Sequence, residues 1–313
     1  MKKRTRWIVL GIILMILVGM YLYASYFFSN QLIARDMRSL AEDLAQTDRG
    51  SYTDYGLPEP ENVSINNGEI TLKGWFFDNE ADGDCGVLLL HGYGGTRNGV
   101  LQYAPLFWER GCDLLAYDAR GHGDSSDAYH TYGYYEKEDG KAALDWFAAK
   151  TGLPHSQIGL AGVSYGAATV LQMLPLVDDV AFVLADSPYQ DLRTIVEHQS
   201  TAQFGSLVKP FVPSAFILAE LRADFDADAV SPINGITETD VPVFLTHSLQ
   251  DEFTPVTNSE AIFAKSNPAI TEFLLTDWGA SHAASIIVDY DLYKQNVTEF
   301  LATYTPDFGL SGE

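Results

Sequence analysis

Apolar residues along the chain form one long run near the N-terminus and many short runs after it. The long run, residues 7–28, contains no charged side chain. As a helix it would span about 33 Å, which is enough to cross a bilayer core of about 30 Å. Aromatic residues favour membrane interfaces, and Trp7 stands at one end while Tyr21, Tyr23 and Tyr26 stand near the other. The pattern predicts a transmembrane anchor over residues 7–28.

The residues before this run predict its orientation. Residues 1–6 read MKKRTR, and the positive-inside rule keeps such a basic segment in the cytoplasm while the rest of the chain is exported. A cleaved signal peptide is the alternative, but its apolar region should be about 7–15 residues long and end in small residues. Here the run is longer and its only small pair is Ala24-Ser25. The sequence therefore favours an uncleaved, single-pass anchor in the cell membrane with the main domain outside the cytoplasm.

Residues 29–58 predict a stalk or linker between the anchor and the main domain. Ile33, Met37, Leu40 and Leu44 recur at helical spacing, which indicates a short amphipathic helix packed on the domain. A solvated linker is the alternative.

The rest of the chain, a domain over residues 59–305 with a tail over 306–313, alternates short apolar runs with helical segments. It opens with two strand-like runs around Asn66-Asn67-Gly68, a turn sequence that predicts a hairpin. Solidly apolar strands that alternate with helices predict an α/β fold, with a mostly parallel central sheet covered by helices on both faces. The expected strands are 61–66, 69–77, Gly86–Leu90, Asp113–Tyr117, Gln157–Val163, Val180–Ala185, Val241–Thr246 and Ile270–Leu275. The expected helices lie near 96–110, 135–150, 165–174, 255–265 and 285–302.

One connection is longer than a simple crossover needs. The chain between Ala185 and Val241 includes the apolar, proline-interrupted segment 204–221. An insertion at about 188–232 would lie above the carboxyl ends of the strands, where open α/β sheets bind ligands. We expect a small lid there, with residues near 204–221 covering the acyl side of a site.

The composition excludes several classes of protein. The chain has 313 residues, of which 47% are hydrophobic, so it can bury a sizeable core and is not mainly disordered. It carries 19 basic and 42 acidic residues, a net charge of −23, and a domain this acidic repels nucleic-acid phosphates. No cysteine or histidine cluster has the spacing of metal ligands. We therefore expect no nucleic-acid partner, no metal and no cofactor.

A GxSxG sequence supplies a candidate nucleophile. Residues Gly162 to Gly166 read GVSYG, directly after the apolar run QIGLAGV and before the helical AATVLQML. A nucleophile elbow requires this order of strand, tight turn and helix, because the glycines permit a turn that larger side chains would block. Ser164 would then project at the top of the sheet, beside the N-terminus of the following helix.

A serine hydroxyl is a weak nucleophile and needs a base and an acid that orients the base. His282 lies in a loop after the last apolar strand, and Asp251 follows the strand VPVFLT. Glu252 and Asp186 are weaker candidates for the acid. The order Ser164, Asp251, His282 is typical of one large class of serine hydrolases.

Two backbone N–H groups are expected to stabilise the oxyanion. One belongs to Tyr165, the residue after the nucleophile, and the other to Tyr93 in the glycine-rich loop HGYGG. His91 at the start of this loop is expected to organise it rather than to act as a base.

Taken together, HGYGG, YDARGHGDS, GVSYG, HSLQDEFTP and the final SH resemble the α/β-hydrolase superfamily over about residues 61–302. Within it, the chain is similar to bacterial membrane-anchored serine hydrolases of the serine-aminopeptidase-like, monoacylglycerol-lipase-like group. The resemblance implies an α/β-hydrolase fold, and it implies that Asp118, Arg120 and His122 support the oxyanion loop. His247-Ser248 departs from the His-Gly of the family at the turn before Asp251.

The motifs predict a membrane-anchored, extracytoplasmic serine hydrolase of the carboxylesterase or lipase class. It would cleave a small-molecule acyl ester through an acyl-enzyme, and it would contact the lipid bilayer through residues 7–28. A peptidase or thioesterase on the same triad is one alternative, although coenzyme A thioesters are cytoplasmic. A non-catalytic binding protein on this fold is another, but such proteins are expected to lose a triad residue and Ser164, Asp251 and His282 are all present.

Cys85 and Cys112 each lie six residues before the end of a strand region, at His91 and Asp118. In this fold those strands are expected to be neighbours, so the two cysteines would lie level at one end of the sheet. A disulfide is then possible, and an exported location permits it. Two buried free thiols are the alternative.

Overall fold

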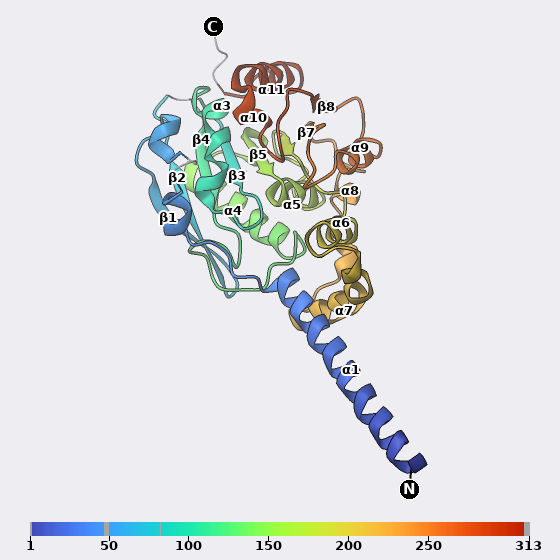
Figure 1. Cartoon of the computed structure of the whole chain (residues 1–313). Helices are drawn as coiled ribbons and strands as arrows, with labels where there is room; N and C mark the ends of the chain where they lie inside the picture. Colours follow the sequence, from blue (N-terminus) through green and yellow to red (C-terminus); the bar gives the residue numbers. More distant parts are fainter. Residues whose placement is uncertain (1, 47–49, 82, 310–313) are drawn as a thin grey trace.

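A computed structural model describes residues 2–46, 50–81 and 83–309. Figure 1 shows a sheet-and-helix domain from which the N-terminal helix α1 projects as a long rod. The described strands form one sheet in the order β1-β2-β4-β3-β5-β6-β7-β8. Their bounds are β1 Glu61–Asn67, β2 Ile70–Phe77, β3 Gly86–Leu90, β4 Asp113–Tyr117, β5 Ile158–Val163, β6 Val183–Asp186, β7 Val243–Ser248 and β8 Thr271–Thr276.

Strands β3 to β8 are parallel, and β1 and β2 add an antiparallel edge. This arrangement confirms the predicted mostly parallel sheet with its opening hairpin. The longer described helices are α1 Lys2–Ile33, α4 Glu136–Thr151, α5 Tyr165–Met173, α6 Leu192–Phe204, α7 Val212–Ala223, α9 Thr257–Phe263 and α11 Tyr290–Tyr304. The shorter ones are α2 Leu40–Leu44, α3 Ala104–Trp108, α8 Pro232–Gly235 and α10 Ser285–Val288, with 3₁₀ turns η1 Tyr52–Tyr55, η2 Arg97–Tyr103, η3 His155–Gln157, η4 Ser206–Phe211 and η5 Ala227–Ala229.

Both faces of the sheet are buried, which is why its central strands are apolar throughout. Along β3, Leu88 and Leu90 pack into the core formed with α4 and α5. Val87 and Leu89 point to the opposite core, formed with η2, α3 and α11. Because side chains alternate between faces along a strand, a strand buried on both sides needs apolar residues at every position.

The two cysteines are joined in a disulfide that ties the starts of β3 and β4. Gly86 pairs with Asp113 in the parallel register, so Cys85 and Cys112 directly precede paired residues. Their Cα atoms lie 4.6 Å apart, within the range that disulfides need. Of the two possibilities that the sequence left open, the structure therefore has the disulfide.

The stalk does not form the single helix that the spacing of Ile33, Met37, Leu40 and Leu44 predicts. Helix α1 continues to Ile33, which is fully buried. The chain then leaves the helical conformation until Ser39 caps α2 with a capping box to Glu42. Leu44 remains exposed. The stalk contacts the domain through two helices separated by the non-helical residues 34–39.

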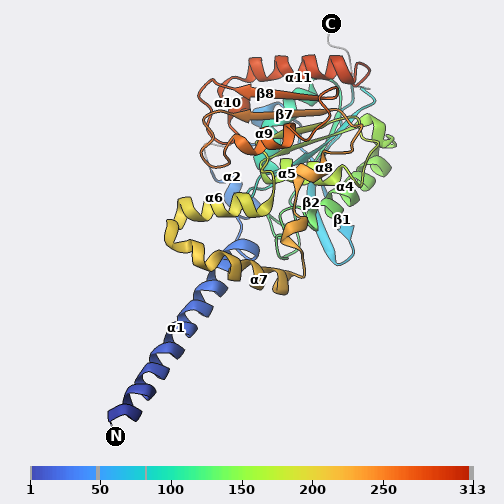
Figure 2. The same cartoon turned by 90° about the vertical axis from the view of Figure 1, so that its right-hand side faces the viewer.

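The long connection between β6 and β7 is helical, and it packs against the end of α1. The Oγ atoms of Ser25 and Ser214 lie 2.7 Å apart. Arg222 of α7 donates a 2.6 Å hydrogen bond to the Ser29 hydroxyl. Figures 1 and 2 show α7 alongside the domain-proximal end of α1 in both views. The connection is thus held to the N-terminal helix as well as to the domain.

The expected tail at 306–313 is partly built into the domain. Phe308 is buried, with its ring centroid 4.9 Å from that of Phe182. Residues 310–313 lie outside the described part of the chain.

Candidate active site

Ser164 lies on a strained turn between β5 and α5, as the GxSxG motif predicts. Its φ of 55° and ψ of −113° are unusual for a residue with a side chain. The flanking glycines make this turn possible. A Cβ on Gly162 would lie 2.4 Å from the Gly166 carbonyl, and one on Gly166 would lie 2.2 Å from the Leu90 carbonyl oxygen. The two glycines are therefore required by close backbone contacts rather than by flexibility.

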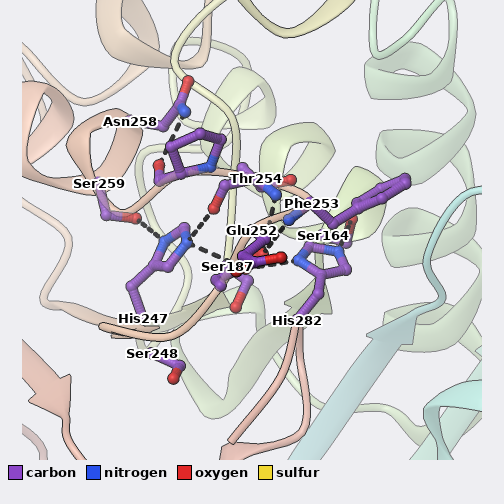
Figure 3. A network of polar contacts seen from close by, with 12 residues as sticks. Ser164, Ser187, His247, Ser248, Glu252, Phe253, Thr254, Asn258, Ser259 and His282 are labelled. Atoms are coloured by element: carbon purple, nitrogen blue, oxygen red, sulfur yellow. Dashed lines mark hydrogen bonds and ion pairs between the residues drawn. The ribbon is translucent and has the colours of Figure 1, made fainter. Parts of the chain in front are cut away.

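The structure brings Ser164, His282 and Asp251 together in one chain of hydrogen bonds. Figure 3 shows the side chains of Ser164 and His282 next to each other. His282 Nε2 lies 2.8 Å from Ser164 Oγ. On the other side of the ring, His282 Nδ1 lies 2.6 Å from Asp251 Oδ2. With the proton on Nδ1, the histidine donates to the carboxylate and its Nε2 is free to accept the serine proton.

Asp251 is buried, and four donors surround its carboxylate. The backbone N–H groups of Phe253 and Thr254 donate to Oδ1 at 2.9 and 2.8 Å. Oδ2 faces both His282 and His247. Burial would raise the pKa of Asp251, but the hydrogen bonds from the two histidines outweigh it and hold that pKa well below its usual value. The lowered pKa favours the ionised carboxylate at neutral pH.

The glycine-rich loop after β3 lies directly against the nucleophile. A Cβ on Gly92 would be 3.6 Å from Ser164 Cβ. His91 shapes this loop as predicted. Its Nε2 accepts from the Ala119 N–H at 3.0 Å, so its Nδ1 carries the proton and donates to the Gly92 carbonyl at 2.7 Å. Burial lowers the pKa of His91, which keeps the ring neutral in this role.

A match to a family profile identifies the protein family of this chain. The profile of the Alpha/beta hydrolase family matches residues 87–302, which include every motif described above. The chain belongs to this family. The match confirms the predicted superfamily and fold, and with the esterase among the similar structures it supports a hydrolase.

Several known proteins resemble this α/β hydrolase. YqkD of Bacillus subtilis, an uncharacterized protein, is 29% identical over 217 residues, covering 69% of this chain and 70% of the relative. YfhR of Salmonella typhimurium, also uncharacterized, is 24% identical over 242 residues, covering 74% and 77%. Among solved structures, the Pyrococcus furiosus esterase Pf2001 matches with a TM-score of 0.66 and 26% identity, covering 82% of this chain and 96% of the esterase.

The carboxylate that contacts His282 is that of Asp251, and the two weaker acid candidates have other surroundings. Asp186 is fully buried, where its carboxylate accepts hydrogen bonds from Tyr103, Tyr293 and Ser187 at 2.8, 3.0 and 2.8 Å. Its role in the described structure is to satisfy these hydroxyl groups at the end of β6. Glu252 instead lines the cleft above Ser164.

The residues implied by resemblance to support the oxyanion loop divide into two groups. Asp118 is buried and forms an ion pair with Arg97, and it accepts from the Arg97 N–H at 2.7 Å, which ties it to the chain just after the loop. The ring of His122 lies 5.2 Å from that of His91. Arg120 differs from the expectation, because it pairs with Asp139 of α4 instead, with Nη2 2.8 Å from Oδ1. A side chain that leaves the loop for a neighbouring helix cannot be located from the motif alone.

A cleft of about 690 Å³ opens above Ser164 and His282. Its walls include Phe253 and Ile287, which are exposed apolar residues. Two further wall residues, Arg38 and Tyr55, come from the stalk. The sequence carried no signal for them, because only the fold brings the stalk to the glycine-rich loop.

Segment 204–221 does not line this cleft, contrary to the expectation that it covers the acyl side of the site. It borders a separate cavity of about 90 Å³ between α1, α6 and α7, to which Phe216 contributes. The physical reason is that α7 packs against α1 rather than across Ser164. Tyr93 lines both spaces, so the glycine-rich loop after β3 forms the wall between them.

No group of three or more metal-ligating side chains occurs among the residues that the structure describes.

Proposed function

We propose that this α/β hydrolase is a serine hydrolase that cleaves a carboxylic ester through an acyl-enzyme. The observation that carries the proposal is the unbroken chain from Ser164 Oγ through the His282 ring to Asp251. Ser164 is the nucleophile, His282 the general base and Asp251 the group that orients the base.

In the first half of the reaction, Ser164 Oγ attacks the ester carbonyl carbon as His282 Nε2 takes the hydroxyl proton. Negative charge develops on the carbonyl oxygen, where the backbone N–H groups of Tyr93 and Tyr165 are the proposed donors. When the tetrahedral intermediate collapses, the imidazolium of His282 gives its proton to the leaving alcohol. The acyl group remains on Ser164.

In the second half, water replaces the alcohol. His282 Nε2 takes a proton from this water as the water oxygen attacks the acyl carbon. When the second tetrahedral intermediate collapses, His282 returns the proton to Ser164 Oγ and the carboxylic acid leaves. Asp251, held ionised, keeps the imidazole oriented and stabilises its charged form in both halves.

A graded series of p-nitrophenyl esters tests this proposal. Ser164→Ala or His282→Ala should lower the rate by about 10⁴-fold or more. A fluorophosphonate probe should label Ser164, as peptide mapping would establish. Label on a different serine, or an unchanged rate in Ser164→Ala, would overturn the assignment.

We also propose that residues 7–28 anchor the enzyme in the cell membrane. Residues 1–6 would lie in the cytoplasm, 29–58 would form the stalk, and the domain over 59–305 would lie outside. Helix α1 is the one described helix long and apolar enough to cross a membrane, and most of it is exposed. Signal sequences share these properties. Sequencing the N-terminus of the mature protein would distinguish an uncleaved anchor from a cleaved signal sequence.

Fractionation tests the anchor and its orientation. The protein should remain with membranes after an alkaline carbonate wash, and protease added to intact spheroplasts should digest the domain. If the domain is protected from the protease, the proposed orientation is wrong. A mature N-terminus near residue 25 would mean that the segment is a cleaved signal peptide.

A peptidase is the second candidate, because Glu252 places a carboxylate in the cleft wall that could bind a substrate ammonium group. Aminoacyl p-nitroanilides compared with the matching esters separate the two activities. If the enzyme is a peptidase, Glu252→Gln should raise the KM for an aminoacyl p-nitroanilide with a free ammonium group. The KM for the corresponding N-acetylated p-nitroanilide, which has no ammonium group, should not change.

A further inference from the structure

The outward face of α7 is apolar, which is the reverse of an ordinary surface helix. Pro213, Ile217 and Leu221 recur every four residues and are exposed. The exposed fractions of Ile217 and Leu221 are 57% and 76%. The opposite face is also apolar and is buried against the domain through Phe216 and Ala219. A helix that is apolar on both faces needs a second apolar environment.

The apolar surface continues beyond α7 in two directions. In η4, just before it in the chain, Leu207 is 86% exposed. Alongside it lies α1, whose Tyr21 hydroxyl donates a 3.2 Å hydrogen bond to the Pro210 carbonyl. The Tyr21 ring also stacks on Phe211 at 5.3 Å. The exposed residues of η4 and α7 therefore adjoin the exposed apolar surface of α1.

The length of α1 relates this surface to a bilayer. From Trp7 to Tyr21, where contacts with η4 begin, a helix rises only about 21 Å at 1.5 Å per residue. A bilayer core is about 30 Å thick. If Trp7 marks the inner boundary and α1 is close to the membrane normal, the outer boundary falls beyond Tyr21, at the level of η4 and α7. Figure 2 shows both elements at the end of the domain from which α1 departs, with α11 at the opposite end.

We propose that η4 and α7 form a second membrane contact, in which Leu207, Ile217 and Leu221 insert into the outer headgroup and acyl boundary beside α1. This inference rests on the proposed anchor. The contact is apolar rather than electrostatic, because an acidic domain gains nothing from anionic headgroups. Arg222 fits such a boundary: its guanidinium lies over the Tyr26 ring, 4.7 Å from the centroid, and binds Ser29.

The contact would fix the long β6–β7 connection at the membrane. Hydrogen bonds from α7 to Ser25 and Ser29 already join it to α1. With its outward face in lipid, this connection is held on two sides, and the cleft above Ser164 is held at a constant height over the bilayer.

Depth-dependent fluorescence quenching tests the contact in the full-length chain in phosphatidylcholine vesicles. Because Cys85 and Cys112 are joined, one introduced cysteine is the only thiol that takes a bimane label. Ile217→Cys and Leu221→Cys are the test positions. Leu17→Cys, on the exposed part of α1, is the control for the anchor. Ala302→Cys, exposed on α11, is the matched control in water.

We expect labels at residues 217 and 221 to emit at shorter wavelength than the label at 302. They should lose most of their fluorescence when the vesicles contain lipids spin-labelled near the headgroup. Emission and quenching like those at residue 302 would overturn the contact. A blue shift without quenching by lipid would also overturn it, because another copy of the chain would then cover the face. Failure of the anchor itself would appear separately, as a label at residue 17 that remains unquenched when the vesicles contain lipids spin-labelled deep in the acyl chains, because about 15 Å separates this residue from Trp7. Circular dichroism melting checks that each labelled chain is folded.

Discussion

His247 Nε2 lies 3.1 Å from Asp251 Oδ2, the same oxygen that binds the catalytic histidine candidate. Its tautomer follows from its partners. His247 Nε2 also lies 2.7 Å from the Thr254 carbonyl, which can only accept, so Nε2 carries the proton. Its Nδ1 accepts from the Ser259 hydroxyl at 2.7 Å. In Figure 3, His247 and His282 point toward the same centre from opposite sides. His247 is therefore a positioning residue that holds the carboxylate for His282.

The first prediction follows from this contact. His247→Leu removes one donor to an ionised carboxylate, and such hydrogen bonds contribute about 1.5–3 kcal/mol. We expect kcat for ester hydrolysis to fall about 10- to 100-fold with little change in KM. His247→Gln retains an N–H group near the Nε2 position and should recover most of the loss. Equal losses in both variants, or an effect confined to KM, would contradict a positioning role.

The second prediction concerns the pH dependence of stability. The pKa of Asp251 is lowered in the folded protein, so its carboxylate contributes stability above its unfolded pKa of about 4 and loses it as pH falls toward the folded pKa. Asp251→Asn lacks this titration. We expect the wild type to exceed the variant in free energy of unfolding at about pH 7, and the difference to shrink below about pH 4. Urea unfolding of both proteins across this range measures it; a difference that does not vary with pH would refute the assignment.

The third prediction separates the cleft from the neighbouring cavity. Ile287 lines the cleft above Ser164, whereas Phe211 packs on α1. Ile287→Ala should change the ratio of kcat/KM between long and short p-nitrophenyl esters, because it alters the wall beside the acyl chain. Phe211→Ala should leave this ratio unchanged. A larger change in ratio for Phe211→Ala would mean that segment 204–221 reaches the substrate after all.

The sequence predicted those parts of the molecule that depend on short-range pattern. The strand Gly86–Leu90 follows from an unbroken apolar run, and the turn at Ser164 follows from glycines whose Cβ would collide with neighbouring backbone. The stalk and the β6–β7 connection were harder to predict, because their positions depend on contacts between distant segments. Arg38 reaches the cleft only because the stalk packs on the loop after β3, as the 2.7 Å hydrogen bond from Thr96 to Asp43 records. No spacing along the chain encodes that contact.

The fourth prediction concerns the disulfide. Cys85 and Cys112 are 27 residues apart in sequence, and closing a loop of this size in the unfolded chain corresponds to about 3 kcal/mol in the loop-entropy account. Changing both residues to serine should lower the free energy of unfolding by about this amount and leave kcat for a soluble ester unchanged. The bond lies at the amino ends of β3 and β4, whereas Ser164 follows the carboxyl end of β5.

Two measurements on the protein check this prediction. Alkylation of the unfolded, unreduced chain followed by mass determination should find no modified cysteine, since thiols joined as a disulfide cannot react. Denaturant titration of the wild type with and without reductant should then reproduce the stability loss of the double serine variant, because both treatments remove the same crosslink. The double serine variant should be insensitive to reductant, which excludes a general effect of the reagent. Two alkylated cysteines in protein isolated from the cell would refute the bond, and would also remove one reason for placing the domain in an oxidising compartment.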